Sequence, residues 1–260
     1  MKIEVISSLQ NPKVKNLVKL FEKSSERRAQ QLIVVEGLRE LGLAISAGMQ
    51  ISQLYFCPTI GAQAEDLVAD QYFEVTKEVF AKIAYRENSD GFIGLLVPRF
   101  YTLETLSLSE SPFIITLEAV EKPGNLGAIL RTADAANIDA VIICDPKTDI
   151  YNPNAIRSSV GCIFTVPIVV TTNEELKEWF DEKGIQYFAA ALTAEKLYTE
   201  IDFKKPSAII LGTEATGLSE FWLNKSTAQI KIPMQGKIDS LNVSISTAVL
   251  TFEANRQRNL

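Results

Sequence analysis

The carboxyl-terminal half of the chain alternates short apolar runs with segments of helical period, and no other feature limits the fold as strongly. Phe113–Leu117 is a nearly continuous apolar run, typical of a strand buried on both faces of a parallel sheet. Further strands are expected at Ala140–Cys144, Val166–Val170, Tyr187–Ala191, Ala208–Leu211 and Ala228–Ile232, and helices at Leu126–Ala136, Asn173–Glu182, Ser219–Leu223 and from Asn242 to about Arg258. Repeated strand–helix units predict a doubly wound α/β sheet, whose ligands bind beyond the carboxyl ends of the strands.

The amino-terminal half shows a second, smaller alternation. A helical pattern runs from Asn11 to about Arg28, and it is followed by strands at Leu32–Val35, Ile51–Phe56, Tyr72–Val75 and Phe92–Val97 and helices at Leu38–Ala47, near Gln63–Ala69 and at Lys77–Ala84. The polar stretch between Pro98 and Pro112 indicates a linker. We therefore expect two α/β domains, residues 1–98 and 112–260, joined by residues 99–111.

Composition limits the available chemistry. The 260 residues include no histidine, which excludes Ser-His-Asp and Cys-His catalysis and removes the commonest metal ligand, so we expect no metal site. Cys57, Cys144 and Cys162 are scattered in apolar surroundings, which favours reduced thiols in a cytoplasmic protein. No apolar stretch has the length of a membrane helix, and no apolar run follows the first residues as in a signal peptide.

The charge distribution bears on a nucleic-acid partner. The net charge of −6 disfavours RNA as an average, but phosphate binding depends on local patches. Six basic residues lie between Asn11 and Arg28, against two acidic ones: Lys13, Lys15, Lys19, Lys23, Arg27 and Arg28. This cluster is equally compatible with an RNA contact and with an ordinary solvated helix face.

The first of three unusual loops follows the strand Phe113–Leu117 and has the sequence EKPGNLGAILR from Glu121 to Arg131. Gly124 permits a tight turn, and the side chain of Asn125 can cap the helix that follows. Arg131 points away from the apolar stripe of that helix, which consists of Leu126, Ile129, Leu130 and Ala133. Taken alone, the segment needs no more than a turn, a cap and one solvated arginine.

The second loop, LGTEATGL, follows the strand Ala208–Leu211 and places Glu214 between Gly212 and Gly217. A glycine at the end of a buried strand lets a ligand approach the backbone closely. A glycine-rich turn with an exposed glutamate would have the same sequence, so this loop alone is a weak signal.

The third loop, IPMQGKIDSLNVS, starts at Ile232 and leads to a helix start that carries Ser240 and Asn242. Capping of the helix accounts for one of these two polar residues. The helix is expected to bury an apolar stripe of Ile245, Ala248, Val249 and Phe252, and it ends on Arg256 and Arg258, which suit the negative end of the helix dipole.

Taken in order, the three loops resemble the three signature motifs of the SpoU/TrmH family of RNA 2′-O-ribose methyltransferases. NLGAILR is similar to the first motif, IILGTEATGL to the second and IPMQGKIDSLNVSISTA to the third, so the resemblance covers Phe113 to Arg258. The amino-terminal half, with NPxVKxLxKL and then VVEG before a helix, looks like the substrate-binding domain related to ribosomal protein L30e. The resemblance implies a catalytic α/β domain with a deep trefoil knot, preceded by a small α/β RNA-binding domain.

The resemblance also assigns residues. By motif match, the catalytic set is Asn125, Arg131, Glu214, Ser240 and Asn242. S-adenosylmethionine is the implied cofactor, with candidate contacts at Gly212, Ile232, Met234, Leu241 and, by position alone, Leu192. Family members are homodimers through the knotted domain, with the active site at the subunit interface. Arg131 has two possible roles: an unusually neutral base, or a charged clamp on an RNA phosphate.

The substrate and the rival functions stay open at this point. The appended domain favours 23S ribosomal RNA over transfer RNA, and a catalytically silent RNA-binding member is the third possibility. Asp145 follows Gly124 by about 20 residues, as in a dinucleotide-binding unit, but EKPGNLG lacks the GxGxxG pattern of NAD-dependent dehydrogenases.

Overall fold

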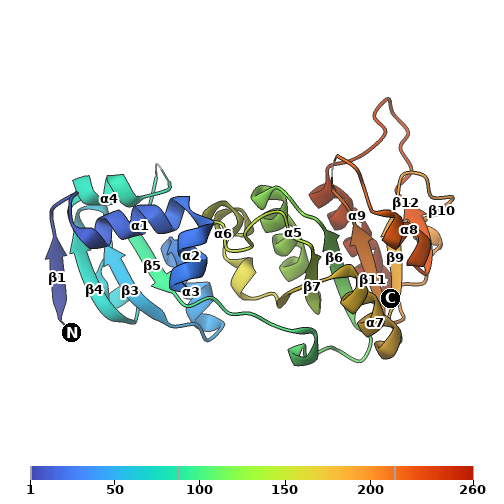
Figure 1. Cartoon of the computed structure of the whole chain (residues 1–260), viewed down its shortest axis with the longest axis horizontal. Coiled ribbons are helices and arrows are strands. Elements are labelled where there is room, and N and C mark those ends of the chain that lie inside the picture. Colours follow the sequence, from blue (N-terminus) through green and yellow to red (C-terminus); the bar gives the residue numbers. More distant parts are fainter. Residues whose placement is uncertain (1, 87, 214, 260) are drawn as a thin grey trace. The chain divides into compact units, whose positions relative to one another are not determined.

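The computed structural model describes residues 2–86, 88–213 and 215–259, which form two compact units. The first unit contains residues 1–99 together with 151–165, and the second contains residues 100–150 and 166–260 (Figure 1). Residues 151–165 thus group with the amino-terminal residues, although they lie in the carboxyl-terminal half of the sequence. The sequence boundaries 1–98, 99–111 and 112–260 stay a prediction.

The first unit is a five-stranded mixed sheet with the strand order β1-β4-β3-β5-β2. Its strands are β1 (Ile3–Ile6), β2 (Ile33–Glu36), β3 (Ile51–Phe56), β4 (Ala69–Val75) and β5 (Phe92–Leu96), and its helices are α1 (Pro12–Glu22), α2 (Ser24–Gln30), α3 (Leu38–Ser46), α4 (Lys77–Ile83) and α6 (Pro153–Ser159). Strands β1, β4 and β3 are parallel, whereas β5 is antiparallel to both β3 and β2. Strand β1 and helix α6 were not predicted.

Two helix predictions in this unit were wrong. The expected helix near Gln63–Ala69 is a single 3-10 turn, Ala64–Asp66, because reciprocal bonds between Gln63 and Asp66 close the turn and the chain then enters β4. The helix expected from Asn11 to Arg28 starts as predicted, with Asn11 as its cap, but it breaks at Lys23. At the break, the Arg27 guanidinium donates to the carbonyl oxygens of Leu20 and Phe21, which the end of α1 leaves without partners.

The second unit is a seven-stranded sheet in which every paired strand is parallel, with the order β10-β12-β9-β11-β6-β7-β8. Its strands are β6 (Phe113–Glu118), β7 (Ala140–Cys144), β8 (Ile168–Thr171), β9 (Gln186–Ala190), β10 (Lys196–Leu197), β11 (Ser207–Leu211) and β12 (Ala228–Lys231). The central strands β6 and β11 are buried along their whole length, as the continuous apolar runs predicted. The prediction of a parallel α/β sheet is confirmed.

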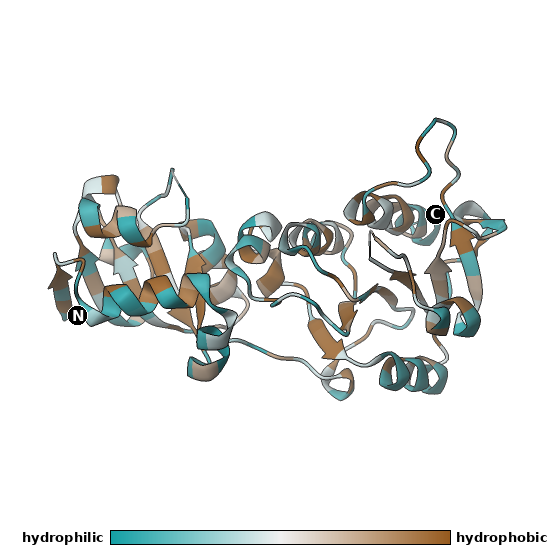
Figure 2. Cartoon of the chain, turned by 45° about the horizontal axis from the view of Figure 1, so that its top comes forward, coloured by the Kyte–Doolittle hydropathy of each residue, from teal (hydrophilic) through white to brown (hydrophobic). Residues whose placement is uncertain are grey.

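Helices cover both faces of this sheet (Figure 2). They are α5 (Pro123–Ala135), α7 (Asn173–Lys183), α8 (Glu220–Lys225) and α9 (Val243–Arg258). Helices α7 and α8 pack on the face that presents Ile114, Ile142 and Ile210. Helices α5 and α9 pack against each other on the opposite face. No helix in the described part of the chain is long and apolar enough to cross a membrane.

The buried face of α5 is the predicted one, but that of α9 is not. Leu126, Ile129, Leu130 and Ala133 of α5 are all fully buried. Helix α9 instead buries Thr247, Leu250, Thr251 and Ala254. Ile245 and Phe252 are 52% and 48% exposed. Thr247 can be buried because its hydroxyl donates to the Val243 carbonyl 2.7 Å away, so a stripe of small residues brings α9 close to its neighbours.

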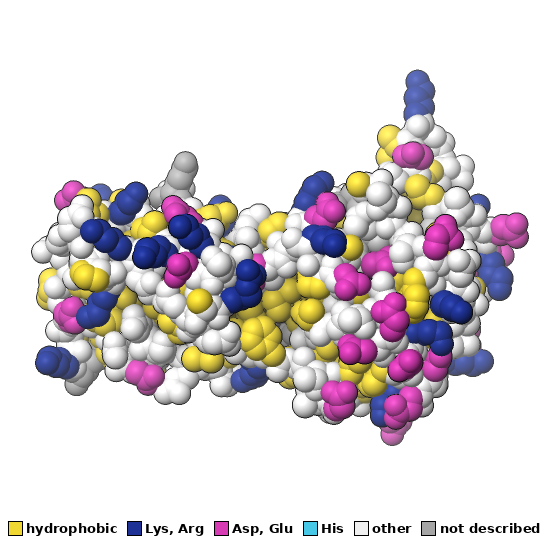
Figure 3. Space-filling model, in the orientation of Figure 1, with side chains coloured by type: hydrophobic (Ala, Val, Ile, Leu, Met, Phe, Trp, Pro, Cys, Tyr) yellow, Lys and Arg dark blue, Asp and Glu magenta, His cyan; other side chains and the backbone are white. Residues whose placement is uncertain are grey.

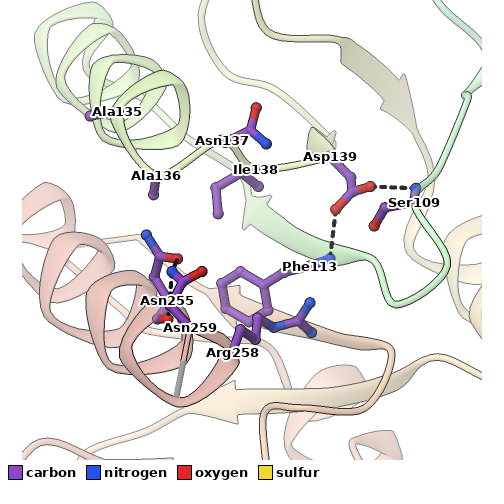
Figure 4. A pocket seen from close by; sticks show the side chains of 10 residues that line it. All are labelled: Ser109, Phe113, Ala135, Ala136, Asn137, Ile138, Asp139, Asn255, Arg258 and Asn259. Carbon is purple, nitrogen blue, oxygen red and sulfur yellow. Dashed lines mark hydrogen bonds between the residues drawn. The ribbon is translucent and has the colours of Figure 1, made fainter.

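Arg258 fastens the end of α9 to the amino-terminal edge of the sheet. Its guanidinium donates to the carbonyl oxygens of Ser111, Pro112 and Lys205 and to the Ser207 hydroxyl. It also lies over the Phe113 ring, 5.1 Å from the centroid. Beside it is a cavity of about 310 Å³, in which the Asp139 carboxylate accepts from two backbone N–H groups (Figure 4).

Arg258→Met should lower the free energy of unfolding by about 2 kcal/mol, because buried carbonyl groups lose a charged donor. Arg256 is the matched control: it lies one half-turn away and pairs with Glu253 on the exposed side of α9. Arg256→Met should cost much less, because an exposed ion pair contributes little to stability. Urea unfolding of both variants measures the difference, and equal losses would contradict the role given to Arg258.

Candidate functional site

The loops that follow β9, β11 and β12 leave the second sheet at the same, carboxyl-terminal edge. Leu192 follows β9, Gly212 follows β11 and Ile232 follows β12. These strands are neighbours in the order β12-β9-β11, and they are parallel, so the three residues leave the sheet side by side at one edge. The fold therefore places three of the five predicted cofactor contacts, Leu192, Gly212 and Ile232, at one edge of the sheet.

A direct hydrogen bond joins the first of the three motif loops, which follows β6, to the third, which follows β12. Asn242 Nδ2 donates to Asn125 Oδ1 over 3.3 Å, across 117 residues of sequence. Asn125 was expected to cap α5, but the helix begins earlier, at Pro123, and Lys122 is its cap residue. Because proline is favoured in the first turn of a helix, Pro123 sets the start and leaves the Asn125 side chain available to face the third loop.

Arg131 lies further along α5 and is exposed to solvent, as predicted. Six residues separate it from Asn125, which corresponds to a rise of about 9 Å and a rotation of about 120° around the helix axis. The two side chains therefore leave α5 in different directions.

The second loop is closed by its own backbone. Thr213 and Gly217 exchange two backbone hydrogen bonds, of 3.1 and 3.0 Å, and the hydroxyl groups of Thr213 and Thr216 are 2.9 Å apart. A Cβ atom on Gly212 would lie 2.1 Å from the Gly217 carbonyl oxygen, so no other residue fits there without a change in the loop. The glycine is thus required by the approach of the chain to itself. Glu214, a predicted catalytic residue, lies outside the described residues.

The two polar candidates of the third loop, Ser240 and Asn242, make different hydrogen bonds. Asn242 caps α9 by accepting from the Ser244 backbone N–H at 2.9 Å, so it is the one that capping explains. Ser240 is exposed and donates to Asp239 within the loop, at 3.1 Å. The apolar candidates are half-buried, namely Ile232, Met234 and Leu241. Leu192 is 60% exposed and is the most exposed of the five cofactor candidates.

The sequence reasoning missed one polar residue in this region. Glu118 ends β6 and is only 6% exposed, and its carboxylate accepts from Asn173 and from both the backbone N–H and the hydroxyl of Ser219. The signal was present, because a carboxylate follows directly on an apolar run. The predicted strand ends at Leu117, one residue before Glu118. Within residues 2–86, 88–213 and 215–259, no group of three or more acidic or cysteine side chains is placed to hold a metal ion.

Comparison with known proteins agrees with this geometry. Residues 112–252 match the model of the SpoU rRNA Methylase family. The chain belongs to this family. Residues 11–94 match the MRM3-like substrate binding domain, which confirms the predicted type of amino-terminal domain.

Individual SpoU relatives resemble the chain over its full length. The 23S rRNA guanosine 2′-O-methyltransferase RlmP of Bacillus subtilis is 27% identical over 95% of this chain and 97% of its own. The crystal structure of an RNA 2′-O ribose methyltransferase is 37% identical, with a TM-score of 0.86 over 99% of this chain and 100% of the other. An rRNA methyltransferase from Sinorhizobium meliloti with bound AdoMet is 30% identical, with a TM-score of 0.89 over 98% of each chain.

Gly212→Ala should disrupt the second loop of this SpoU domain, because the added methyl group collides with backbone atoms that cannot move aside cheaply. We expect a loss of about 2 kcal/mol or more in unfolding free energy. Gly42→Ala is the control, since Gly42 lies inside α3 with nothing within 4 Å of the new atom, and it should be neutral or stabilising. Thermal unfolding compares the two, and a stable Gly212→Ala protein would refute the loop geometry.

Proposed function

We propose that the protein transfers a methyl group from S-adenosylmethionine to a ribose 2′-hydroxyl of structured RNA, with 23S ribosomal RNA as the substrate. The observation that carries this proposal is the convergence of the loops after β9, β11 and β12 with the Asn125–Asn242 pair. RlmP and the AdoMet-bound Sinorhizobium meliloti enzyme, both similar over nearly the whole chain, support the substrate and the cofactor.

The residues at this edge fit the cofactor. Ile232, Met234 and Leu241 are half-buried apolar side chains beside strand ends, where backbone N–H and C=O groups are exposed to a ligand. An adenine ring requires this combination of apolar walls and a few polar groups at the edge. We assign these three residues, with Gly212 and Leu192, to cofactor binding.

When bound, S-adenosylmethionine supplies an electrophilic methyl group, which the ribose oxygen attacks in line. The residues of the chain must align that oxygen and stabilise the negative charge that it develops as its proton passes to solvent water. We assign Asn125, Asn242 and Ser240 to positioning by hydrogen bonds, and Glu214 to orienting Arg131. Because a guanidinium stays protonated, we favour a charged Arg131 that clamps an RNA phosphate over a neutral Arg131 that acts as a base.

Arg131→Ala should lower kcat by at least about 100-fold and leave the Kd for S-adenosylmethionine within about twofold, because the charge acts on RNA. Arg131→Lys should restore part of the rate, since a lysine keeps the charge but loses the bidentate geometry. Single-turnover kinetics with labelled cofactor measure both variants. Wild-type turnover in Arg131→Ala would remove this arginine from the mechanism.

Asn242 has a capping role and a proposed catalytic role, and two substitutions separate them. Serine is also a good cap but is too short to reach Asn125, so Asn242→Ser should lower kcat/KM by about tenfold or more at nearly unchanged stability. Asn242→Ala should lose the activity and also about 1 kcal/mol of stability. Methylation rates and melting curves decide the matter: a fully active Asn242→Ser enzyme confines this residue to capping.

We also propose that the SpoU domain carries the deep trefoil knot implied by its motifs and forms a homodimer. Ile245, Val249 and Phe252 share one face of α9, at spacings of four and three residues, and two of them are about half exposed. A second copy of the chain would cover this apolar face. Because Arg131 and Asn125 leave α5 about 120° apart, a shared site would let Arg131 of one subunit serve the other.

Phe252→Lys should raise the dimer dissociation constant by about tenfold or more, because a charge would be buried in an apolar contact. Val68→Lys is the control: Val68 is 80% exposed in the first unit, and its substitution should leave the dimer intact. Sedimentation velocity over a range of concentrations measures both. A monomeric wild-type protein would contradict the proposed dimer.

The first unit is proposed to bind the RNA. Lys15, Lys19, Lys23 and Arg28 are exposed on α1, α2 and the break between them, where Figure 3 shows basic side chains gathered. Two members of the predicted basic cluster are engaged elsewhere, since Arg27 is buried and Lys13 pairs with Glu4 at 2.7 Å. The remaining four form a compact positive surface suited to phosphates.

The function is tested by incubating the protein with labelled S-adenosylmethionine and either 23S ribosomal RNA or transfer RNA, followed by mapping of 2′-O-methyl positions. We expect one specific ribose methylation in 23S ribosomal RNA. Methylation of transfer RNA would replace the substrate, and RNA binding without transfer would identify a silent member of the family. We place the activity in the cytoplasm, consistent with three free, buried cysteines.

A further inference from the structure

Glu118 is a buried carboxylate that accepts hydrogen bonds from three neutral donors. Its Oε1 atom accepts from the Ser219 hydroxyl at 2.6 Å and from Asn173 Nδ2 at 2.8 Å, and its Oε2 atom accepts from the Ser219 backbone N–H at 2.8 Å. Among the described residues, no lysine or arginine forms an ion pair with it. A buried charge is costly unless hydrogen bonds compensate it. The loss of any one of these three hydrogen bonds would therefore destabilise the ionised carboxylate.

The hydrogen bonds continue beyond the carboxylate. Asn173, at the first position of α7, accepts from Trp222 Nε1 through its side-chain oxygen at 2.6 Å. Trp222 lies on α8 and is fully buried. The chain Trp222–Asn173–Glu118–Ser219 therefore joins the end of β6 to the starts of α7 and α8. Each residue in it fixes the orientation of the next, so the carboxylate has one arrangement available.

Ser219 shows that this arrangement takes precedence over ordinary helix capping. It is the cap residue of α8, yet its side chain makes no capping hydrogen bond to that helix. Its hydroxyl is turned to Glu118 instead. A serine at this position normally stabilises a helix by capping it, whereas this hydroxyl bonds to β6 instead.

The two segments that Glu118 connects are those that carry the proposed cofactor site. Ser219 directly follows the second loop, residues 211–218, in which Thr213 and Gly217 exchange two backbone hydrogen bonds. On the other side, β6 leads through Ala119, whose φ is 52°, into α5 with Asn125. The carboxylate thus sets the distance between the second loop and the first.

We propose that Glu118 is a positioning residue for S-adenosylmethionine binding: it holds the Gly212–Gly217 loop against the exit of β6 in the geometry that the cofactor requires. This inference rests on the proposed function, because it concerns the same cofactor. Glu118 does not touch the reacting atoms. Its loss should therefore weaken cofactor binding and leave the methyl transfer step largely intact once the site is saturated.

Glu118→Gln is the test, because the amide has the same shape but can accept on one side only, so one donor of Asn173 or Ser219 faces another donor. We expect the Kd for S-adenosylmethionine, measured by calorimetry, to rise about tenfold or more. At saturating cofactor, kcat should change less than about threefold, which is a split between KM and kcat. Ser219→Ala removes one of the three bonds and should give a smaller rise.

Two controls separate positioning from general destabilisation. Thr116 lies on the same strand face as Glu118, and its buried hydroxyl has no hydrogen-bond partner in the described part of the chain, so Thr116→Val should leave the Kd unchanged. Ile142→Val, in the core beside β6, should lower the melting temperature without weakening cofactor binding.

The outcomes are distinct. A wild-type protein that does not bind S-adenosylmethionine would refute the proposed function, and this inference with it. A wild-type protein that binds it, with a Glu118→Gln variant that binds equally well, would refute the inference alone. A rise in Kd that Ile142→Val reproduces at the same melting temperature would also refute it, since stability would then explain the effect.

Discussion

The parallel arrangement of the second sheet is the constraint on which the rest of the structure depends. Because all its paired strands run the same way, each one delivers its carboxyl end, and the loop that follows, to a single edge. Adjacent strands β12, β9 and β11 come from distant parts of the chain, so residues 40 positions apart leave the sheet as neighbours. The opposite edge carries the Arg258 fastening and has a structural role.

The parallel strands bring the loops to one edge, and a few polar contacts then set their positions relative to one another. The Asn125–Asn242 bond ties the first loop to the third, and Glu118 ties the second to β6. Thr213 and Gly217 join the two ends of the second loop by two backbone hydrogen bonds. These contacts use neutral donors and short side chains, which hold backbone segments close together. The chain has no histidine, so any catalysis relies on other side chains and on their placement.

The sequence predicted what depends on continuous or periodic apolar residues. The runs that form β6, β7 and β11 and the stripe of α5 lie where expected, because burial on both strand faces or one helix face leaves a clear pattern. It failed where the apolar pattern is short or polar residues decide. Helix α6 has only seven residues, threonines lie on the buried face of α9, and Arg27 donates to the last carbonyl groups of α1 across a break. Asn125 and Glu118 act through distant partners, which spacing along the chain does not reveal.

The loops after β9, β11 and β12, residues 191–194, 211–218 and 232–242, are proposed to form one cofactor site. Hydrogen–deuterium exchange of the protein with and without S-adenosylmethionine tests it most directly, because exchange reports each segment separately. We predict that S-adenosylmethionine slows exchange in all three segments together. Protection confined to the cavity beside Arg258, or to one segment while the other two are unchanged, would contradict it.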